Sequence, residues 1–247
     1  MNSSAPLDPK TLDLLGTAST ATITTQLFKH GFRQQFLVGL TPSNPGAASF
    51  VGIARTLRFI PSREDKDFDL GLLHQRGENN MQWEAVEATQ PGEVLVIDSR
   101  NDISAASGGD MLMTRLMRRG AAAAVTDGAW RDGLALSGLP FPTYARANTA
   151  TTRPASFRAA DMQVPIGCCG VAVYPGDVVV SDGNGVVVVP YGIADVLARD
   201  CAAQEQLEIF LYEKIAAGAP LWGTYPPNEE TLRLYAEHKA QNAKANR

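Results

Sequence analysis

The stretch VLVIDSRNDISAASGGDMLMTRLMRRGAAAAVTDGAWRD, residues 94–132, decides the fold of this chain. It opens with an apolar run, passes through polar residues to a pair of glycines, and then shows apolar residues at helical spacing. A second run of small and β-branched residues follows Gly120. This pattern predicts, in order, a strand, a polar loop, a helix that Gly120 ends and a second strand, over residues 94–98, 99–107, 108–119 and 121–126.

Chain direction predicts where a site would form. A strand–helix–strand unit is expected to be parallel and right-handed, so both strands end at the same edge of the sheet. Asp110 in the first helical turn should therefore lie near Arg131 and Asp132, which follow the second strand. The crevice at this edge is where open α/β sheets usually bind ligands. We predict the apolar face of the helix to be Met111, Leu112, Met113, Leu116 and Met117.

The residue types at this edge suit one kind of chemistry. A carboxylate can bind a hard cation, an arginine can hold a carboxylate or keto oxygen, and a glycine-rich helix start can bind an anion. The pattern therefore predicts a site that holds a divalent metal and a 2-keto acid side by side.

Residues 91–190 resemble the RraA-like family, which includes class II pyruvate aldolases acting on 4-hydroxy-4-methyl-2-oxoglutarate and 4-carboxy-4-hydroxy-2-oxoadipate. The matching pieces are GDML, DGAWRD and PGDVVVSDGNGVVVVP, at 109–112, 127–132 and 175–190. The spacing Asp110–x20–Arg131–Asp132 resembles the aldolase signature of that family. Family members that regulate ribonuclease E share the fold and lack the final aspartate, so Asp132 favours the enzyme.

The residues themselves predict a layered α/β sandwich. The resemblance implies a β/β/α sandwich of the phosphohistidine-domain-like, swivelling type, here with a helical C-terminal extension. We predict a catalytic domain over 1–190 and a helical extension over 191–247 that packs on a neighbouring subunit. The resemblance also implies a homo-oligomer, either a trimer or a dimer of trimers, with the site at a subunit boundary.

The resemblance assigns roles to the three signature residues. Asp132 would bind the metal; the alternative is a turn cap. Arg131 would bind substrate and stabilise a developing enolate. Asp110 would order metal-bound water, although an acidic residue here also favours the helix dipole without any metal. The metal would be Mg²⁺ or Mn²⁺, since oxygen ligands dominate and His30, His74 and His238 lie far apart in the sequence.

Further residues complete the predicted site. The glycines 108 and 109 should act through the backbone, so that the amides of Gly109, Asp110, Met111 and Leu112 bind the substrate carboxylate. The resemblance implies a glutamate of an adjacent subunit that reaches the metal through water, with Glu205 the first choice and Glu208 the second. Arg146 and Arg153 could meet a second substrate carboxylate or remain solvated. Structural roles are predicted for Asp98, Asp102, Asp127, Asp182, Cys168 and Cys169.

The predicted function is a metal-dependent lyase that cleaves a 4-hydroxy-2-oxo acid to pyruvate and a carbonyl product, with oxaloacetate decarboxylase side activity. One alternative is a metal-dependent enzyme acting on another, sugar-derived 2-keto acid. The other is a non-catalytic protein that binds a ribonuclease.

Composition sets limits on partners and compartment. The chain of 247 residues carries a net charge of −4, which gives no electrostatic reason to expect nucleic acid. It lacks the run of about 18 apolar residues that a membrane span needs, and its start lacks signal-peptide features. Three cysteines make no disulfide framework, so we expect a cytoplasmic protein.

The flanking segments predict the remaining elements. Asp8 or Thr11 would cap a single first helix. The paired Pro-Gly turn and valine-rich runs of 175–190 predict a hairpin. The predicted helices are 8–30, 81–88, 191–217 and 229–240, the further strands are 36–40 and 50–60, and a solvated loop is predicted over 61–80.

Overall fold

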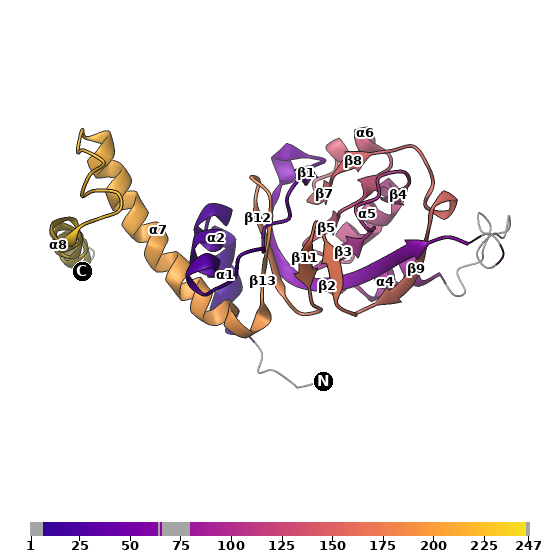
Figure 1. Cartoon of the computed structure of the whole chain (residues 1–247), viewed down its shortest axis with the longest axis horizontal. Helices are drawn as coiled ribbons and strands as arrows, with labels where there is room; N and C mark the ends of the chain where they lie inside the picture. Colours follow the sequence, from indigo (N-terminus) through magenta and orange to yellow (C-terminus); the bar gives the residue numbers. More distant parts are fainter. Residues whose placement is uncertain (1–6, 64, 66–79, 246–247) are drawn as a thin grey trace.

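A mixed eight-stranded sheet forms the centre of the molecule (Figure 1). The computed structural model describes residues 7–63, 65 and 80–245. The strand order is β1-β7-β5-β3-β2-β12-β13, and β9 also pairs with β2. The strands are β1 Thr41–Pro42, β2 Ser49–Pro61, β3 Glu93–Asp98, β5 Ala123–Thr126, β7 Thr143–Ala145, β9 Phe157–Met162, β12 Val178–Asp182 and β13 Val186–Val189.

Two smaller sheets and several helices surround this sheet. A parallel three-stranded sheet consists of β4 Ala106–Gly108, β6 Ala129–Trp130 and β8 Ala147–Asn148. An antiparallel ribbon consists of β10 Ile166–Cys168 and β11 Val171–Val173. The helices are α1 Pro9–Thr17, α2 Thr20–Lys29, α4 Met81–Ala88, α5 Asp110–Arg118, α6 Gly133–Ser137, α7 Ala194–Ala216 and α8 Glu229–Ala245, with short 3-10 turns η1 Pro45–Ala47, η3 Arg153–Ala155 and η4 Tyr191–Ile193.

The predicted β/β/α layering is confirmed by how β3 buries its two faces. Val94 and Val96 pack in a core that includes the β10–β11 ribbon. Leu95 and Ile97, which point the other way, pack in a core that includes α4, α5 and α6. A strand buried on both faces reads as a continuous apolar run, as this one does. The layers are therefore ribbon, sheet and helices.

The parallel pairing of β3 with β5 confirms the unit on which the site depends. Val94 to Ile97 stand in register with Ala123 to Thr126, so both strands end together. The helix between them, α5, begins at Asp110, two residues later than predicted. Its inner face is Met113 and Leu116, with Leu112 and Met117 partly buried. The prediction was wrong for Met111, which is 82% exposed because it lies in the first turn beside the pocket described below.

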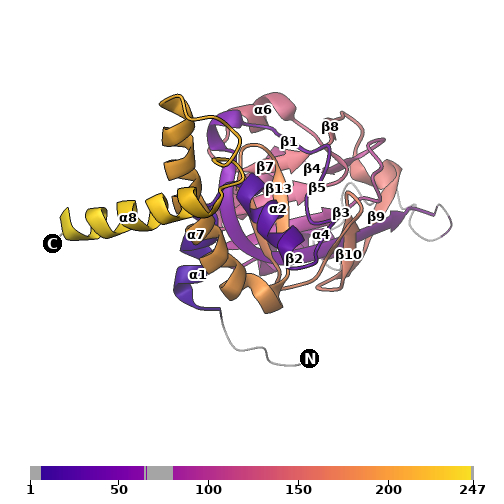
Figure 2. The ribbon, with the colours of Figure 1, turned by 60° about the vertical axis from the view of Figure 1, so that its left-hand side comes forward.

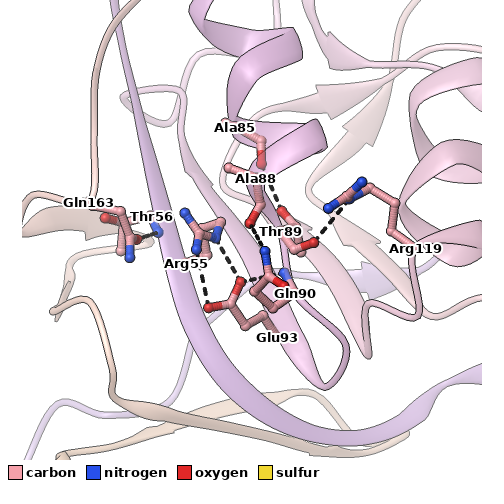
Figure 3. A network of polar contacts seen from close by, with 9 residues as sticks. All are labelled: Arg55, Thr56, Ala85, Ala88, Thr89, Gln90, Glu93, Arg119 and Gln163. Carbon is pink, nitrogen blue, oxygen red and sulfur yellow. Dashed lines mark hydrogen bonds and ion pairs between the residues drawn. The ribbon is translucent and has the colours of Figure 1, made fainter.

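Figure 3 shows a polar network where α4 leads into β3. Arg55 Nε donates to Glu93 Oε2 at 2.7 Å, and the backbone N–H of Gln90 donates to the same oxygen at 2.7 Å. Arg119, just after α5, donates from Nε to the carbonyl of Thr89 at 3.0 Å. These contacts fix the amino end of β3 to its neighbours, and so determine where its carboxyl end emerges.

The N-terminal segment corrects the prediction of one helix over 8–30. Asp8 caps α1 as predicted, but Ala18 is extended and the chain restarts as α2. Three acceptors stabilise the break: Ser19 Oγ accepts from the N–H of Thr22, Glu205 accepts from the N–H of Ser19 at 2.8 Å, and Asp182 accepts from the N–H of Thr20 at 2.8 Å. The cap from Ser19 is local, whereas the two carboxylates come from distant segments of the chain, and together they outweigh helix continuity.

The predicted strand 36–40 was also wrong. Phe36 forms only an isolated bridge with Val187, and Gly39 has a φ of +89° that ends the extended run. By contrast, the predicted strand 50–60 is confirmed as β2, and the hairpin 175–190 as β12 and β13. The predicted loop over 61–80 lies largely outside the described residues.

The C-terminal helices project from the body of the molecule (Figures 1 and 2). The first turns of α7 share a core with α1 and α2, through Leu197 and Ala198 against Leu15 and Ile23. Further along, Phe210 of α7 packs against Tyr235 of α8, with ring centroids 5.4 Å apart. The division at residue 190 and the packing of this arm on another subunit stay predictions. In the described part of the chain, every helix is too short or too polar to cross a bilayer.

Gly52 of β2 generates a stability prediction. A Cβ there would lie 2.5 Å from the carbonyl oxygen of Gly92 and 2.8 Å from a methyl of Val94. Because backbone cannot yield as a side-chain tip does, Gly52→Ala should lower the free energy of unfolding by about 1–3 kcal/mol. Gly167→Ala is the control, since its Cβ would meet nothing within 4 Å. Urea unfolding should show no more than about 0.5 kcal/mol for the control; equal losses in both variants would contradict this packing.

Candidate functional site

A pocket of about 330 Å³ lies at the start of α5. Its walls come from four places: the chain before and within α4, the β4–α5 junction, the residues after β6, and the η3 turn. The lining residues are Asn80, Gln82, Trp83, Ala106, Gly108, Gly109, Asp110, Met111, Leu112, Arg131, Asp132, Thr152, Arg153 and Pro154. The three signature residues and the predicted backbone positions therefore lie in one pocket, as chain direction predicted.

Asp132 lies at the N-cap position of α6 with a left-handed φ of 58°. Its side chain makes no capping hydrogen bond to that helix. Instead the carboxylate turns toward the start of α5, where Oδ2 accepts from the N–H of Asp110 at 3.4 Å. A Cβ on Gly109 would lie 2.5 Å from this same oxygen, so glycine is needed for the approach. Asp132 therefore does not cap the helix that it begins, and its binding of a metal stays a prediction.

Asp110 occupies the first position of α5, and its Oδ1 accepts from the N–H of Met111 at 2.7 Å. The N–H groups of Asp110 and Met111 therefore donate to the chain's own carboxylates. We predicted that these amides bind a substrate carboxylate. These two contacts show that the helix start attracts anionic oxygens. A substrate carboxylate would have to share or replace them.

Arg131 brings a positive charge to the pocket that these two carboxylates line. Its backbone N–H donates to the carbonyl of Gly108 at 2.8 Å, which fixes the residue to the strand before α5. The side-chain Nε is buried and has no hydrogen-bond partner within the described residues. A buried donor left unpaired costs free energy, so this guanidinium favours an incoming acceptor oxygen.

A buried carboxyl holds the edge of the sheet together behind the pocket. Asp127 is fully buried and accepts from the N–H of Ser99 at 2.6 Å and from that of Asn101 at 2.9 Å. Burial raises the pKa of Asp127 to about 6, those hydrogen bonds oppose the rise, and the nearby Asp98 carboxylate adds to it. Asp127 is the turn-forming residue that we predicted, and it fastens the loop after β3 to the end of β5.

Three hydroxyls complete this buried cluster. Ser99 Oγ lies 2.7 Å from Ser107 Oγ, which lies 2.8 Å from Thr126 Oγ1. A Cβ on Gly128 would come within 2.6 Å of Ser107 Oγ, so the chain toward Arg131 passes directly over the hydroxyls. These residues position the site without lining it. Sequence reasoning missed them because small polar residues after a strand look like an ordinary loop.

The wall formed by Gln82 and Trp83 was also missed. Gln82 is buried and donates from Nε2 to the carbonyl of Ser107 at 2.6 Å, which joins α4 to the strand before α5. Trp83 lines the pocket while 46% of its surface stays exposed. The sequence predicted a helix over 81–88. Its local pattern does not distinguish a residue that faces the pocket from one that faces the core.

The sequence left open whether Arg146 and Arg153 meet a second substrate carboxylate, and the structure places these two arginines differently. Arg153 lines the pocket. Arg146 lies outside the lining set and donates to Asn101 Oδ1 at 3.0 Å. Three aspartates have the structural roles predicted: Asp98 and Asp102 accept from the N–H groups of residues two positions later, and Asp182 caps the start of α2. Cys168 is buried in β10, and Cys169 forms the turn that follows.

Glu205 has a clear role within its own chain. Its Oε1 accepts from the N–H of Ser19, at the break between α1 and α2. Hydrogen bonds from Ser19 and Thr22 lower the pKa of Glu205, although burial opposes them more strongly than any single bond. Glu208 accepts from Gln204 Nε2 at 2.7 Å. That either glutamate reaches the pocket of an adjacent subunit stays a prediction.

Two carboxylates, Asp110 and Asp132, are available to a metal in this pocket. Groups of three or more histidine, cysteine, aspartate or glutamate side chains are absent from the residues that the structure describes. Zinc, which takes three or four such ligands, fits this set poorly. Mg²⁺ is usually bound by one or two carboxylates and completes its shell with water and substrate oxygens. The donor set therefore fits Mg²⁺ or Mn²⁺.

Comparisons with known proteins show which family this chain resembles. Residues 20–188 match the family model described as Aldolase/RraA. A protein of Halalkalibacterium halodurans named "Putative 4-hydroxy-4-methyl-2-oxoglutarate aldolase" is 37% identical over 116 residues. That match covers 47% of this chain and 55% of the relative, so the chain spans about half the length of that relative.

Solved structures share the fold over most of the chain. An uncharacterized protein from Pseudomonas syringae has a TM-score of 0.74 at 25% identity, and the match covers 90% of this chain and all of that one. Streptomyces coelicolor RraAS2, described as an unusual member of the RNase ES inhibitor RraA family, has a TM-score of 0.73 at 31% identity. That match covers 84% of this chain and 98% of the Streptomyces chain.

The raised pKa of Asp127 predicts a pH dependence of stability. Because the folded state binds this proton more tightly than the unfolded chain does, the stabilisation is complete below the unfolded pKa and is lost as the pH rises through about 6. The contribution should fall by about 3 kcal/mol at most, since one pKa unit corresponds to about 1.4 kcal/mol.

Urea unfolding at several pH values between about 4 and 7 tests this linkage. Asp127→Asn should be less stable at every pH, because it replaces an acceptor oxygen with a donor, but its stability should depend less on pH than that of the wild type. Asp13→Asn, at an exposed position of α1, is the control and should keep the wild-type slope. An unchanged slope in Asp127→Asn would refute the assignment.

Proposed function

The chain belongs to the Aldolase/RraA family, and from that membership we propose that it is a divalent-metal-dependent lyase. It would cleave a 4-hydroxy-2-oxo acid to pyruvate and a second carbonyl compound. The observation that carries the proposal is the meeting of Asp110, Arg131 and Asp132 in one pocket, with the Nε of Arg131 buried and unpaired among the described residues. The name of the Halalkalibacterium halodurans relative supports the substrate class.

Groups of different charge in the pocket would bind different parts of the substrate and the metal. Arg131 would hold the 2-keto oxygen, where negative charge develops as the C3–C4 bond breaks. The helix start would hold the C1 carboxylate, since its N–H groups already donate to carboxylate oxygens. Asp132 would hold the metal. A bound Mg²⁺ or Mn²⁺ would polarise the keto oxygen as a Lewis acid.

Proton movement falls to Asp110 with water. In the cleavage, the C4 hydroxyl loses its proton, the C3–C4 pair enters the pyruvate enolate, and C3 then gains a proton. None of the described residues that line the pocket is a histidine. Asp110 lines the pocket together with Arg131 and Asp132, and its carboxylate could orient a water for these transfers. His74 lies outside the described residues.

The same residues should decarboxylate oxaloacetate. Loss of carbon dioxide from oxaloacetate leaves the same pyruvate enolate, so a site that stabilises one stabilises the other. A sugar-derived 2-keto acid would use the same chemistry with a different leaving half. The homo-oligomer, as a trimer or dimer of trimers, forms part of the proposal, with Glu205 or Glu208 of an adjacent subunit reaching the metal through water.

A second candidate function is the binding of a ribonuclease. The likeness to Streptomyces coelicolor RraAS2 favours it, because that protein is described as a member of an RNase inhibitor family. Fold alone does not decide between the two functions, since function lies in the site. Co-purification of a ribonuclease with this chain, together with absent pyruvate release, would favour the regulator.

The role of Arg131 gives the first prediction for this function. Arg131→Ala should lower kcat for pyruvate release from 4-hydroxy-4-methyl-2-oxoglutarate by about 10²- to 10³-fold, the usual cost of removing one oxyanion donor. Lactate dehydrogenase coupling measures the pyruvate. Arg118→Ala, at an exposed position of α5, is the control and should keep full activity. Full activity in Arg131→Ala would overturn the role given to this residue.

The role of Asp132 gives the second prediction. Magnesium should raise the thermal unfolding temperature of the wild type, because a ligand that binds only the folded state stabilises it, and EDTA should reverse the effect. Asp132→Asn should lose both the magnesium shift and magnesium-dependent pyruvate release from oxaloacetate. Asp161→Asn, whose carboxylate pairs with Arg58 away from the pocket, should keep both. A normal magnesium shift in Asp132→Asn would place the metal elsewhere.

A further inference from the structure

A second arginine reaches the pocket from a part of the chain far from the signature residues. Arg153 begins the η3 turn, between β8 and β9, and lines the same pocket as Arg131. None of the steps proposed for the lyase uses Arg153. Its neighbours Thr152 and Pro154 line the pocket as well, so the turn as a whole forms one wall.

Contacts with the core hold the Arg153 side chain in place. Its Nη1 donates to the carbonyl of Phe157 at 3.0 Å. Its guanidinium carbon lies 5.9 Å from the centre of the Phe59 ring, which is fully buried and stacks on the ring of Phe157. A guanidinium fixed on an aromatic face loses little further entropy when it binds a ligand.

Arg153 has no acidic partner among the residues that the structure describes. Six other arginines, Arg55, Arg58, Arg63, Arg115, Arg119 and Arg233, pair with carboxylates. Burial lowers the pKa of Arg153, and within the described ranges no carboxylate opposes this effect. An arginine nevertheless stays charged at neutral pH. A partly desolvated cation without a counter-charge is unfavourable, so this side chain favours an anion in the pocket.

We propose that Arg153 determines substrate specificity by binding a carboxylate, or a similar compact anion, on the half of the substrate that leaves as the carbonyl product. The inference deepens the proposed function and depends on it for the placement of the pyruvate half at Arg131. With one arginine for each half, the pocket favours 2-keto acids that carry a second anionic group over those that end in a neutral one.

A matched pair of ligands tests the proposal without turnover. The acids 2-oxoglutarate and 2-oxopentanoate have the same five carbons and differ only in a terminal carboxylate or methyl group. Calorimetry with magnesium present should show that the wild type binds the diacid at least about 10-fold more tightly, which corresponds to about 1.4 kcal/mol.

Two variants separate charge from structure. Arg153→Gln keeps an N–H donor for the carbonyl of Phe157 and removes the charge, so it should bind both acids about equally while its affinity for 2-oxopentanoate stays within about 2-fold. Arg153→Lys keeps the charge and should retain part of the preference. Arg146→Met, which removes an arginine outside the pocket lining, should keep all of it. Thermal unfolding checks that each variant is folded.

The outcomes separate this inference from the lyase itself. An undiminished preference for the diacid in Arg153→Gln overturns the proposal, as does a wild type that binds the diacid no better than the monoacid. Equal weakening of both ligands in a folded Arg153→Gln also overturns it, because that is what a merely structural role predicts. If the preference depends on Arg153 but no pyruvate is released from any 4-hydroxy-2-oxo acid, the anion site stands and the lyase proposal fails.

Discussion

The carboxyl of Asp127 connects the two halves of the strand–helix–strand unit on which the rest of the structure depends. It accepts hydrogen bonds from the backbone of Ser99 and Asn101, so the loop that leaves β3 is tied to the end of β5. Parallel strands put their carboxyl ends at one edge, but they do not by themselves fix the loops that follow. The buried carboxyl and the three hydroxyls beside it fix those loops. Such a cluster is unfavourable to bury unless it is hydrogen-bonded, and each of its four side chains has a partner.

The site inherits its geometry from that edge. The chain passes over the hydroxyl cluster at Gly128, and Arg131 is then tied by its backbone to Gly108. Asp132 adopts a left-handed conformation that turns its carboxylate to the start of α5 rather than to its own helix. A non-glycine residue in this region costs free energy, and such strain is often found at functional positions. The bare backbone of Gly109 provides the room for this carboxylate.

The charged side chains of the pocket suit it to hold both a cation and an anionic substrate. Two carboxylates and two arginines line a single pocket, and neither arginine forms an ion pair within the described ranges. Carboxylates can hold a cation, whereas unpaired guanidinium groups favour anionic oxygens. A family that contains both aldolases and ribonuclease inhibitors uses one fold for two functions. The side chains of the pocket, and not the fold, must therefore distinguish an enzyme from a regulator.

The sequence by itself determined the parallel unit, the two-faced strand β3 and the meeting of Asp110, Arg131 and Asp132. These follow from periodicity and chain direction, which act over short stretches of chain. The tertiary structure alone decided three other features: the break between α1 and α2, the wall formed by Gln82 and Trp83, and the entry of Arg153 into the pocket. Each depends on a partner that is distant in sequence, such as Asp182 and Glu205 for the break and Phe59 and Phe157 for Arg153. A local pattern cannot encode such a partner, because its hydrogen bond or ring contact exists only after the sheet has brought the segments together.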